Sequence, residues 1–288
     1  MRLGLFHFQL LYQVLESIHY IYEEHELANT VLKSISTALN AEGGTIFKLM
    51  PDQSLYPLAS YGAPIEKLRE AKFAVGQGVV GWVAEHAQPV KVDRPGQDTR
   101  FLGMIDSSTG FKTRTILAAP IIAKGKTIGV IEFLNRKEGP FNIPDLELVS
   151  MVGREVGIAF ENVNLIKGLN DARQFLEAVA NSLSAGLVVS DQQGRLLKVN
   201  PRGLEILGLD KDESVWVAQP LGRFFASAPG LMKIIKGVID DGAPVVRQET
   251  VITIDGKNRT IGYSGVPVNA KTGERLGSAL LYQDITSL

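Results

Sequence analysis

An unbroken helical pattern from Asp145 to Ser182 constrains this chain of 288 residues more than any other feature. Pro144 suits the first turn of a helix, and no proline occurs within the pattern. Apolar residues recur at steps of three and four, the spacing of one helix face, with Arg173 as the polar exception. The residues that we expect to form a signalling and dimerisation stripe on this face are Val152, Ala159, Val163, Ile166, Leu169 and Leu176.

A helix of this length exceeds what one small domain needs for its core. We therefore expect it to end one domain, to begin another and to pair with its copy in a homodimer, as a short coiled coil. The alternative is two ordinary terminal helices that break near Gly168, since glycine weakens a helix.

The composition fits about two domains and excludes several kinds of site. There is no cysteine, so disulfides, thiolate catalysis and cysteine-ligated zinc are excluded, and four histidines argue against a histidine-rich metal site. A net charge of −1 gives no reason to expect nucleic acid as a partner. The apolar stretch from Leu3 to Leu15 is too short to span a bilayer, so we expect a cytoplasmic protein without membrane insertion.

Upstream of the long helix, the pattern predicts an antiparallel sheet that is covered on one face by helices. We expect an N-terminal helix over 1–24 and a second helix from Leu27 to Leu39, which ends near Gly43 and Gly44. The other expected elements are strands over 45–50, 55–61, 89–92, 115–122 and 127–134 and short helices over 65–71 and 79–86.

Gly76, Gly78 and Gly81 form a literal G-x-G-x-x-G, which can indicate a dinucleotide-binding turn. That fold needs a full crossover helix and an acidic residue about twenty positions later. Here the helix over 79–86 is too short to connect parallel strands, and Asp93 follows Gly81 by only twelve residues. The pattern therefore does not indicate a Rossmann site.

The blocks VGQGVVGWVAEHAQPVKVD and TILAAPIIAKGKTIGVIEFLNRKEGPFNIPDLELV, between two flanking helices, resemble a GAF domain. We assign residues 25–163 to this GAF-like domain. The resemblance implies a pocket over the sheet, covered by the loop from Asp93 to Gly110 and by the short helix near Val79. We expect Trp82, Arg100, Phe101 and Arg114 to line it, with arginine as an anion clamp. Packing of the aromatic residues and surface exposure of the arginines is the alternative.

Some GAF relatives bind cyclic nucleotides and carry an Asn-Lys-Phe-Asp-Glu signature. This chain has Asn135, Lys137, Phe141 and Asp145, but Leu146 stands where the glutamate belongs. The same positions also suit structural roles, because Asn135 can end a strand and Asp145 can cap a helix. Bilin attachment, found in other relatives, has no cysteine to use.

Downstream of 145–182, the connecting signalling helix, the pattern predicts two strands, helices and three strands. The blocks GLVVSDQQGRLLKVNPRGLEILG and YSGVPVNAKTGERLGSALLYQDIT resemble a PAS domain, over residues 175–288. Strands are expected over 185–190, 195–199, 245–254, 259–266 and 276–285, and one amphipathic helix over 221–242. The expected lining of a small-molecule cavity is Asn200, Phe224, Phe225, Tyr263 and Tyr282, although aromatic residues of this kind also form cores.

The cofactor is unknown at this stage. No histidine lies beyond His86, so a histidine-ligated haem in the PAS-like part is excluded, as is a cysteinyl flavin. A noncovalent nucleotide or flavin stays open. His25 and its neighbours echo a kinase phosphoacceptor box without the following Arg and Pro, and they fit better as a charged helix start.

The fold class that we expect is α+β, with two antiparallel-sheet sensor domains joined by a long helix. The function that we expect is a non-catalytic sensor of a two-component or related signalling system, which binds a small ligand or partner and transmits its state through a dimeric helix. The alternative is a ligand-free scaffold that recruits a histidine kinase or a transcription regulator. A GAF-type methionine-sulfoxide reductase would need redox cysteines, which are absent. The chain ends two residues after the triad Asp284-Ile285-Thr286, so it acts alone or is part of a longer sensor.

Overall fold

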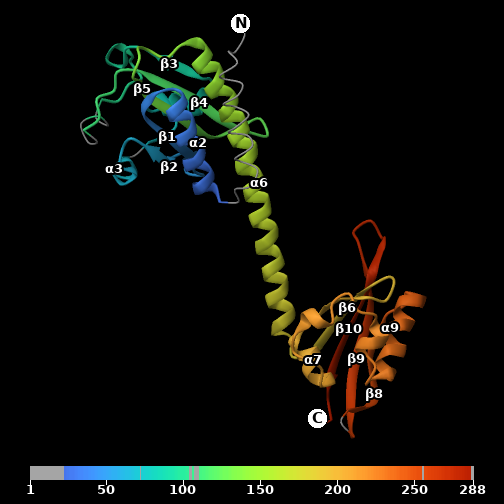
Figure 1. Ribbon diagram of the computed structural model, residues 1–288. Coiled ribbons are helices and arrows are strands. Elements are labelled where there is room, and N and C mark those ends of the chain that lie inside the picture. The colour runs from blue at the N-terminus through green and yellow to red at the C-terminus, as the bar shows by residue number, and fades with distance from the viewer. Residues whose placement is uncertain (1–22, 72, 104–105, 107–109, 255, 287–288) are drawn as a thin grey trace. The chain divides into compact units, whose positions relative to one another are not determined.

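The computed structural model describes residues 23–71, 73–103, 106, 110–254 and 256–286 (Figure 1). Its contacts divide the chain into two compact units, Met1–Leu169 (unit 1) and Asn170–Leu288 (unit 2). Each unit is described separately below. The N-terminal helix expected over 1–24 falls almost entirely outside the described residues. Within the described part, no helix combines the length and the apolar character needed to cross a membrane.

Unit 1 contains a five-stranded antiparallel sheet with the strand order β2-β1-β5-β4-β3. β2 has the bounds expected from the sequence. β1 begins earlier than expected and includes Gly43 and Gly44, which pair with β5. Glycine suits position 44 because a side chain there would meet Phe133 and a backbone carbonyl of β5. The strands are β1 (Ala41–Leu49), β2 (Leu55–Tyr61), β3 (Val90–Val92), β4 (Ile116–Ala123) and β5 (Lys126–Arg136).

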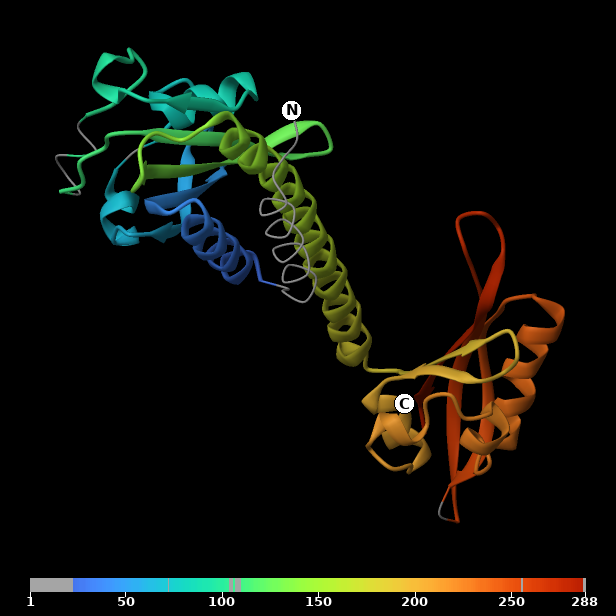
Figure 2. The ribbon, with the colours of Figure 1, turned by 45° about the horizontal axis from the view of Figure 1, so that its top comes forward.

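Helices cover both faces of this sheet, and the expectation of one covered face was wrong (Figure 2). α2 (Glu24–Ala38) and the first part of α6 (Ile143–Ser182) pack on one face. α3 (Ile65–Glu70) and α4 (Gly78–His86) pack on the other, and a 3₁₀ turn, η1 (Pro95–Gln97), follows β3. The short apolar α4 buries Val79, Val80 and Val83, which is why the second face is also covered.

α6 is one continuous helix of 40 residues that passes through Gly168, so the alternative of two broken helices was wrong. Its first half packs closely on the sheet at two glycines. A Cβ atom at Gly153 would lie 2.4 Å from the carbonyl oxygen of Pro120, and one at Gly157 would lie 2.1 Å from that of Ile122. These glycines therefore permit a close helix–sheet approach that outweighs their low helix propensity.

Unit 2 contains a second five-stranded antiparallel sheet, with the order β7-β6-β10-β9-β8. Its helices form a single core with one face of the sheet. The expected helix over 221–242 is in fact two helices, because the first ends at Phe224 and the second begins at Pro229, a residue that suits a helix start. The elements are β6 (Gly186–Asp191), β7 (Leu196–Val199), α7 (Pro201–Leu207), η2 (Glu213–Val215), α8 (Leu221–Phe224), α9 (Pro229–Asp241), β8 (Val245–Ile254), β9 (Lys257–Asn269) and β10 (Arg275–Asp284).

Candidate ligand-binding site

Unit 1 holds a cavity between its sheet and the side covered by α3 and α4. Its empty volume is about 730 Å³, which includes space open to solvent. The wall is largely apolar and contains five aromatic rings, the composition typical of small-molecule sites. The described lining residues are Gly43, Gly44, Thr45, Phe47, Tyr61, Ala63, Leu68, Phe73, Gln77, Gly78, Val79, Val80, Phe101, Leu102, Asp106, Phe111, Thr113, Ile116, Glu132 and Leu134.

The alternation of side chains along the strands determines which residues form the floor of this cavity. On β5, Ile131 and Phe133 join the core under α2 and α6, so Glu132 and Leu134 face the opposite side. On β1, Thr45 and Phe47 face the cavity for the same reason. The sheet therefore presents one carboxyl group in the middle of an otherwise mostly apolar floor.

The glycine-rich turn before α4 forms one wall. Gly76 and Gly78 have φ of +79° and +73°, which L-residues with side chains rarely adopt. A Cβ atom at Gly81 would lie 2.2 Å from the carbonyl oxygen of Ala74. The three glycines thus permit the tight turn that brings the start of α4 to the cavity.

Glu132 is the most perturbed acid of the cavity. Enclosure by protein and, to a smaller extent, the negative charge of Asp106 together raise its pKa from 4.5 to about 8. The residue keeps some accessible surface because it faces the cavity. Among the described residues, its carboxyl has no hydrogen-bond partner. At neutral pH the empty cavity therefore holds this group mainly in its protonated form.

Asp106, the second acid, is held in place by Thr113. One carboxylate oxygen accepts a hydrogen bond from the Thr113 backbone N–H at 2.7 Å, and the other accepts one from the hydroxyl at 2.6 Å. The described lining contains no lysine or arginine. The cavity thus combines two carboxyl groups with aromatic walls and no basic side chain among the described residues.

Only one of the four residues expected to line this pocket is part of its described lining. Phe101 lines the cavity, but Trp82, Arg100 and Arg114 are not part of its lining. The Arg100 guanidinium lies 4.5 Å from the centre of the Trp82 ring and donates two hydrogen bonds to Asp98, at 2.9 and 2.7 Å. The hydrogen bonds from Arg100 lower the pKa of the Asp98 carboxyl.

Arg114 is engaged elsewhere. It donates to the Glu42 carboxylate at 2.7 Å, which is the largest cause of a lowered Glu42 pKa. The anion clamp expected from Arg100 and Arg114 therefore does not form in this cavity, because both guanidinium groups bind acids of the protein.

Glu132 and Asp106 were missed by reasoning from the sequence. A usable signal was present for Glu132, since it follows Val130 and precedes Leu134 on the same face of an apolar strand. A charged residue at such a position is either exposed at an edge or turned toward a cavity. Asp106 lies in a loop, where no periodic pattern marks it.

The signature-like residues Asn135, Lys137, Phe141 and Asp145 do not line the cavity. Asn135 accepts from the backbone N–H of Arg114 and donates to Glu42 and to the carbonyl of Lys112. Asp145 pairs with Arg136 at 2.7 Å and accepts from the backbone of Asn142 at the helix start. Phe141 is buried in the core. Asn135 and Asp145 therefore have the structural roles that the sequence allowed.

In unit 2 the aromatic residues expected to line a cavity fill the core. Phe224 packs edge-on against Phe225, with ring centres 4.9 Å apart, and Phe225 packs against Tyr282 at 6.4 Å. All three are buried. The Tyr282 hydroxyl donates to the carbonyl of Gly203 at 2.9 Å, and burial raises its pKa. Tyr263 is partly buried and borders, with Tyr282, a shallow hollow.

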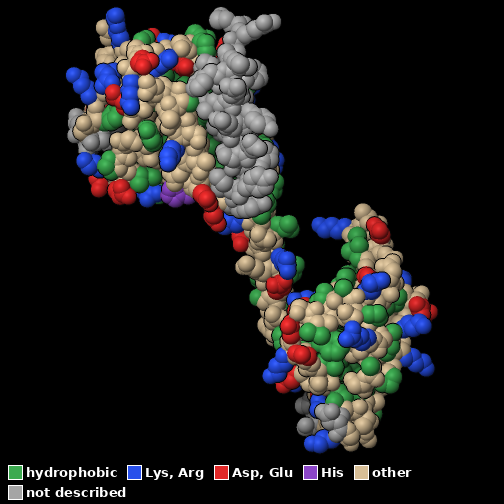
Figure 3. Space-filling model, viewed as in Figure 1, with side chains coloured by type: hydrophobic (Ala, Val, Ile, Leu, Met, Phe, Trp, Pro, Cys, Tyr) green, Lys and Arg blue, Asp and Glu red, His purple; other side chains and the backbone are tan. Residues whose placement is uncertain are grey.

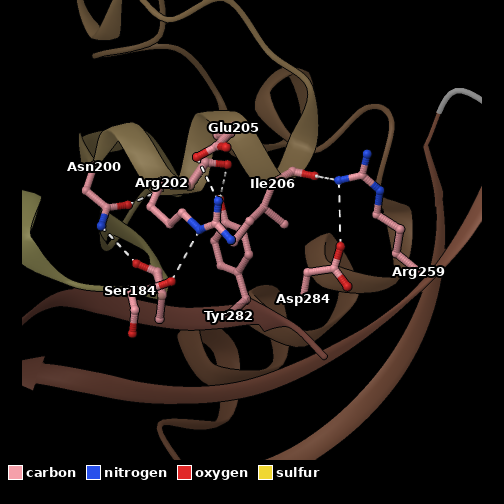
Figure 4. A network of polar contacts seen from close by, with 10 residues as sticks. Ser184, Asn200, Arg202, Glu205, Ile206, Arg259, Tyr282 and Asp284 are labelled. Carbon is pink, nitrogen blue, oxygen red and sulfur yellow. Dashed lines mark hydrogen bonds and ion pairs between the residues drawn. The ribbon is translucent and has the colours of Figure 1, made fainter. Parts of the chain in front are cut away.

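Asn200 is a structural junction in unit 2 (Figure 4). Its side-chain oxygen accepts from the backbone N–H groups of Leu187 and Gly203, at 2.8 and 2.9 Å. Its amide nitrogen donates to the carbonyl of Ala180, near the end of α6, at 3.0 Å, and to that of Ala185 at 2.9 Å. Every hydrogen-bonding position of this buried side chain is used, so it ties α6, β6 and α7 together.

Two arginines make further polar contacts in this part of unit 2 (Figure 4). Arg202 donates to Glu205 at 2.7 Å and to the carbonyl of Ser184 at 3.3 Å. Arg259 donates to the carbonyl of Ile206 at 3.1 Å and lies 3.8 Å from Asp284. Arg259, on β9, therefore contacts both the end of α7 and the last strand, β10.

The stripe expected on α6 divides into two parts. Val152, Ala159 and Val163 are buried in the core of unit 1 and are therefore not accessible to a partner. Ile166, Leu169 and Leu176 are exposed, Leu169 by 72%. Figure 3 shows hydrophobic side chains on the exposed part of the helix.

The exposed half of α6 carries a more regular apolar repeat than the one expected. Steps of four and three alternate without interruption, and Arg173 falls beside the repeat instead of within it. All members are exposed. We call this repeat the α6 seam; it consists of Leu165, Leu169, Ala172, Leu176 and Val179 in α6 and of Leu183, the residue that follows the helix. In the described part of the chain, no group of three acidic or histidine side chains is arranged to hold a metal ion.

Comparison with protein families gives two matches. A model described as "GAF domain" matches residues 23–160, and one described as "PAS fold" matches residues 180–288.

Two curated proteins illustrate the relatives of the first match. The probable 3′,5′-cyclic phosphodiesterase pde-5 of Caenorhabditis elegans is 28% identical over 148 residues, which cover 50% of this chain and 20% of that protein. The dual 3′,5′-cyclic-AMP and -GMP phosphodiesterase 11 of Drosophila melanogaster is 30% identical over 173 residues, 54% of this chain and 12% of that protein. The chain thus spans a small part of these relatives.

Solved structures support the fold of both units. A GAF domain of a phosphoenolpyruvate-protein phosphotransferase from Coxiella burnetii superposes with a TM-score of 0.51 at 14% identity, over 56% of this chain and 96% of that one. The Escherichia coli DhaR(N)–DhaL complex contains a chain that matches 98% of this chain, with 91% of its own length, a TM-score of 0.51 and 17% identity.

Proposed function

This chain contains a GAF domain followed by a PAS domain, and from this premise we propose that it is a cytoplasmic, non-catalytic signal-transduction sensor. In this proposal a small molecule binds in the cavity of the GAF domain, and the occupied state is transmitted through a dimer of α6. The observation that carries the proposal is the contrast between the two interiors. The GAF interior contains a cavity with a largely apolar lining, whereas aromatic side chains fill the PAS interior.

Ligand binding is tested on the full chain by mass spectrometry of the purified protein after denaturation, followed by a thermal-shift screen with nucleotides, flavins and amines. A ligand that binds only the folded state raises the melting temperature. The variant Ala63→Trp, which fills the cavity, is expected to abolish the shift. An exposed substitution outside the cavity, Ala87→Gly, serves as the control, because Ala87 has the left-handed φ of +53° that glycine tolerates. The absence of any ligand and of any shift would reject a sensing role for the cavity.

The α6 seam supports the dimeric part of the proposal. Leucines fill most of its positions at heptad spacing, and they are exposed in the single chain, where burial by a second copy would be favourable. The family resemblance and the length of α6 point the same way. We expect a parallel coiled coil in which both copies bring the same face together.

The seam is tested by Leu169→Asp with Leu176→Asp, which place charges in the interface. Light scattering is expected to show a monomer, with circular dichroism unchanged. The matched control, Lys167→Asp with Gln174→Asp, alters exposed residues that lie opposite the seam and should leave the dimer intact. A dimer that survives the first pair and dissociates with the second would contradict the assignment.

A second candidate is a protein-interaction scaffold without a ligand, which recruits a histidine kinase or a transcription regulator. Two observations favour it. The outer face of the PAS sheet exposes apolar side chains, including Leu197, Val251 and Leu281. In addition, the structural neighbour that spans almost the whole chain was solved in a complex with a second protein. Binding of a partner that is unaffected by Ala63→Trp would favour the scaffold.

A further inference from the structure

We propose that the GAF cavity selects a compact organic cation with an apolar, preferably aromatic, body, held by Glu132 and Asp106. This inference rests on the proposed sensing function and adds the class of ligand. It starts from the balance of charge in the cavity, where two carboxyl groups face the same space and no described lining residue is basic. A positively charged ligand would supply the missing counter-charge.

The two acids have different roles in this arrangement. Both oxygens of Asp106 already accept hydrogen bonds from Thr113, so this carboxylate is fixed in position and contributes mainly its charge. The Glu132 carboxyl has no hydrogen-bond partner among the described residues and stands on the rigid floor of β5. It is therefore the group that is available to a ligand. A cation beside Glu132 would form a charge-assisted hydrogen bond in a site largely shielded from water.

The walls suit the same kind of molecule. Phe47, Tyr61, Phe73, Phe101 and Phe111 all line the cavity. The faces of such rings carry negative electrostatic potential and attract ammonium or amidinium groups, while the rings also bury an apolar body. Aromatic walls alone would accept a neutral ligand, but only a cation also satisfies both acids.

An anionic ligand is disfavoured by the same features. The first turn of α4 lines the cavity and contributes a positive partial charge of roughly half a unit. That contribution is smaller than the charge of the Asp106 carboxylate alone, and ionisation of Glu132 adds a second negative charge. The arginines that sequence patterns offered as an anion clamp are bound to Asp98 and Glu42 instead. A cyclic nucleotide would therefore bring its phosphate into a cavity without a cationic partner.

The carboxyl of Glu132 should also make the affinity for a cation depend on pH. Its surroundings favour the protonated state, because burial and repulsion from Asp106 together raise its pKa to about 8. The titratable groups of the described lining are Glu132, Asp106 and Tyr61. A bound cation would favour ionised Glu132, so binding should tighten between about pH 6 and pH 8.

The test is isothermal titration of the full chain with three probes of similar shape: phenethylamine, 2-phenylethanol and phenylacetate. Cyclic GMP is titrated in parallel. We expect phenethylamine to bind more tightly than the neutral and anionic probes by at least tenfold at pH 8. Glu132→Gln should remove that preference, because an amide stays neutral. Asp106→Asn should reduce it by a smaller factor, and Glu66→Gln, an exposed acid on α3, should leave it unchanged.

The outcomes separate this inference from the proposed function. Equal or tighter binding of 2-phenylethanol, phenylacetate or cyclic GMP overturns the cation assignment but retains a ligand-binding cavity. A cation preference that persists in Glu132→Gln, with Asp106→Asn also neutral, overturns the role of the two acids. If no probe binds and no small molecule is found in the purified protein or the thermal-shift screen, both proposals fail.

Discussion

The GAF and PAS domains of this chain are built on the same strand order and differ in what covers the sheet. If the strands of each domain are numbered along the chain, both sheets have the order 2-1-5-4-3. The GAF sheet is covered by helices on both faces, and a cavity remains under the second cover. The PAS sheet forms a core with helices on one face, and that core is filled by large side chains.

The comparison teaches that an interior void depends on side-chain volume and not on topology. In the PAS domain, Phe224, Phe225 and Tyr282 occupy the space between helices and sheet. At the corresponding layer of the GAF domain, small residues such as Gly43, Thr45 and Ala63 leave space. Close packing is the ordinary state of protein interiors, so the void is the feature that indicates a function.

The largest expected effect is a loss of stability of the PAS domain, whose core is filled by side chains. Phe224→Ala should destabilise the PAS domain by about 3–5 kcal/mol, because it removes a fully buried ring and leaves a cavity. The matched change Phe101→Ala should cost the GAF domain roughly 1 kcal/mol, because this ring is only partly buried beside an existing void.

The chain offers one tryptophan in each domain for this measurement, Trp82 in the GAF domain and Trp216 in the PAS domain. Urea denaturation is followed by fluorescence in Trp82→Phe and Trp216→Phe backgrounds, so that each domain is observed separately. Equal losses of stability in the two domains would show that the GAF interior is packed as tightly as the PAS interior.

An intermediate effect is expected in the GAF domain, where Glu132 should make the free energy of unfolding depend on pH. Because the pKa of Glu132 is raised from 4.5 to about 8, the folded protein keeps a proton that the unfolded chain releases in this window. Wild-type stability should therefore fall as the pH rises from about 4.5 to 8. Glu132→Gln should remove that loss and stabilise the GAF domain by up to roughly 3 kcal/mol at pH 7, with no gain near pH 4.

The measurement is urea denaturation at pH 4, 6, 7 and 8 in the background that retains Trp82. Glu66→Gln, which alters an exposed acid, is the control and should show no such trend. A variant that is less stable than wild type across the whole range would mean that the Glu132 carboxylate is stabilising, contrary to its surroundings.

The smallest expected effect tests the border of the cavity. Arg100→Ala removes a cation from the Trp82 ring and two hydrogen bonds from Asp98 at a partly exposed site, which should cost less than about 1 kcal/mol. Trp82 fluorescence should change, whereas the affinity for any cavity ligand should stay the same. A tenfold loss of affinity would place Arg100 in the binding site after all.

The sequence alone predicted the periodic parts of this molecule well. The two sheets, the long helix and the strand β2 follow from apolar spacing, which reflects burial directly. The short helices α3 and α4 were predicted, but the apolar pattern did not predict that they cover the second face of the GAF sheet. Only the family resemblance indicated a cover by the helix near Val79. The break before Pro229 was also missed, although proline there marks a helix start.

The candidate site was less accessible to prediction than the fold. Aromatic and arginine residues were predicted as site residues because of their residue type, but tertiary contacts determine their actual partners. Arg100 binds Asp98, and Phe224 packs on Phe225. Glu132, the acid that distinguishes the cavity, lies in an apolar strand. Its role depends on which face of the sheet its side chain occupies, and the sequence did not reveal a cavity on that face. Similarly, the α6 seam became clear only when burial separated the core half of the helix from the exposed half.

The protonated carboxyl on β5 has a further consequence for how a sensor of this kind reports on its surroundings. An incoming cation that takes the place of the Glu132 proton makes binding an exchange of one positive charge for another, so the net charge of the cavity does not change. Occupancy then follows the ratio of ligand to protons instead of ligand concentration alone. The same domain would read a given amount of cation as a weaker stimulus in an acidified cell and as a stronger one in an alkaline cell.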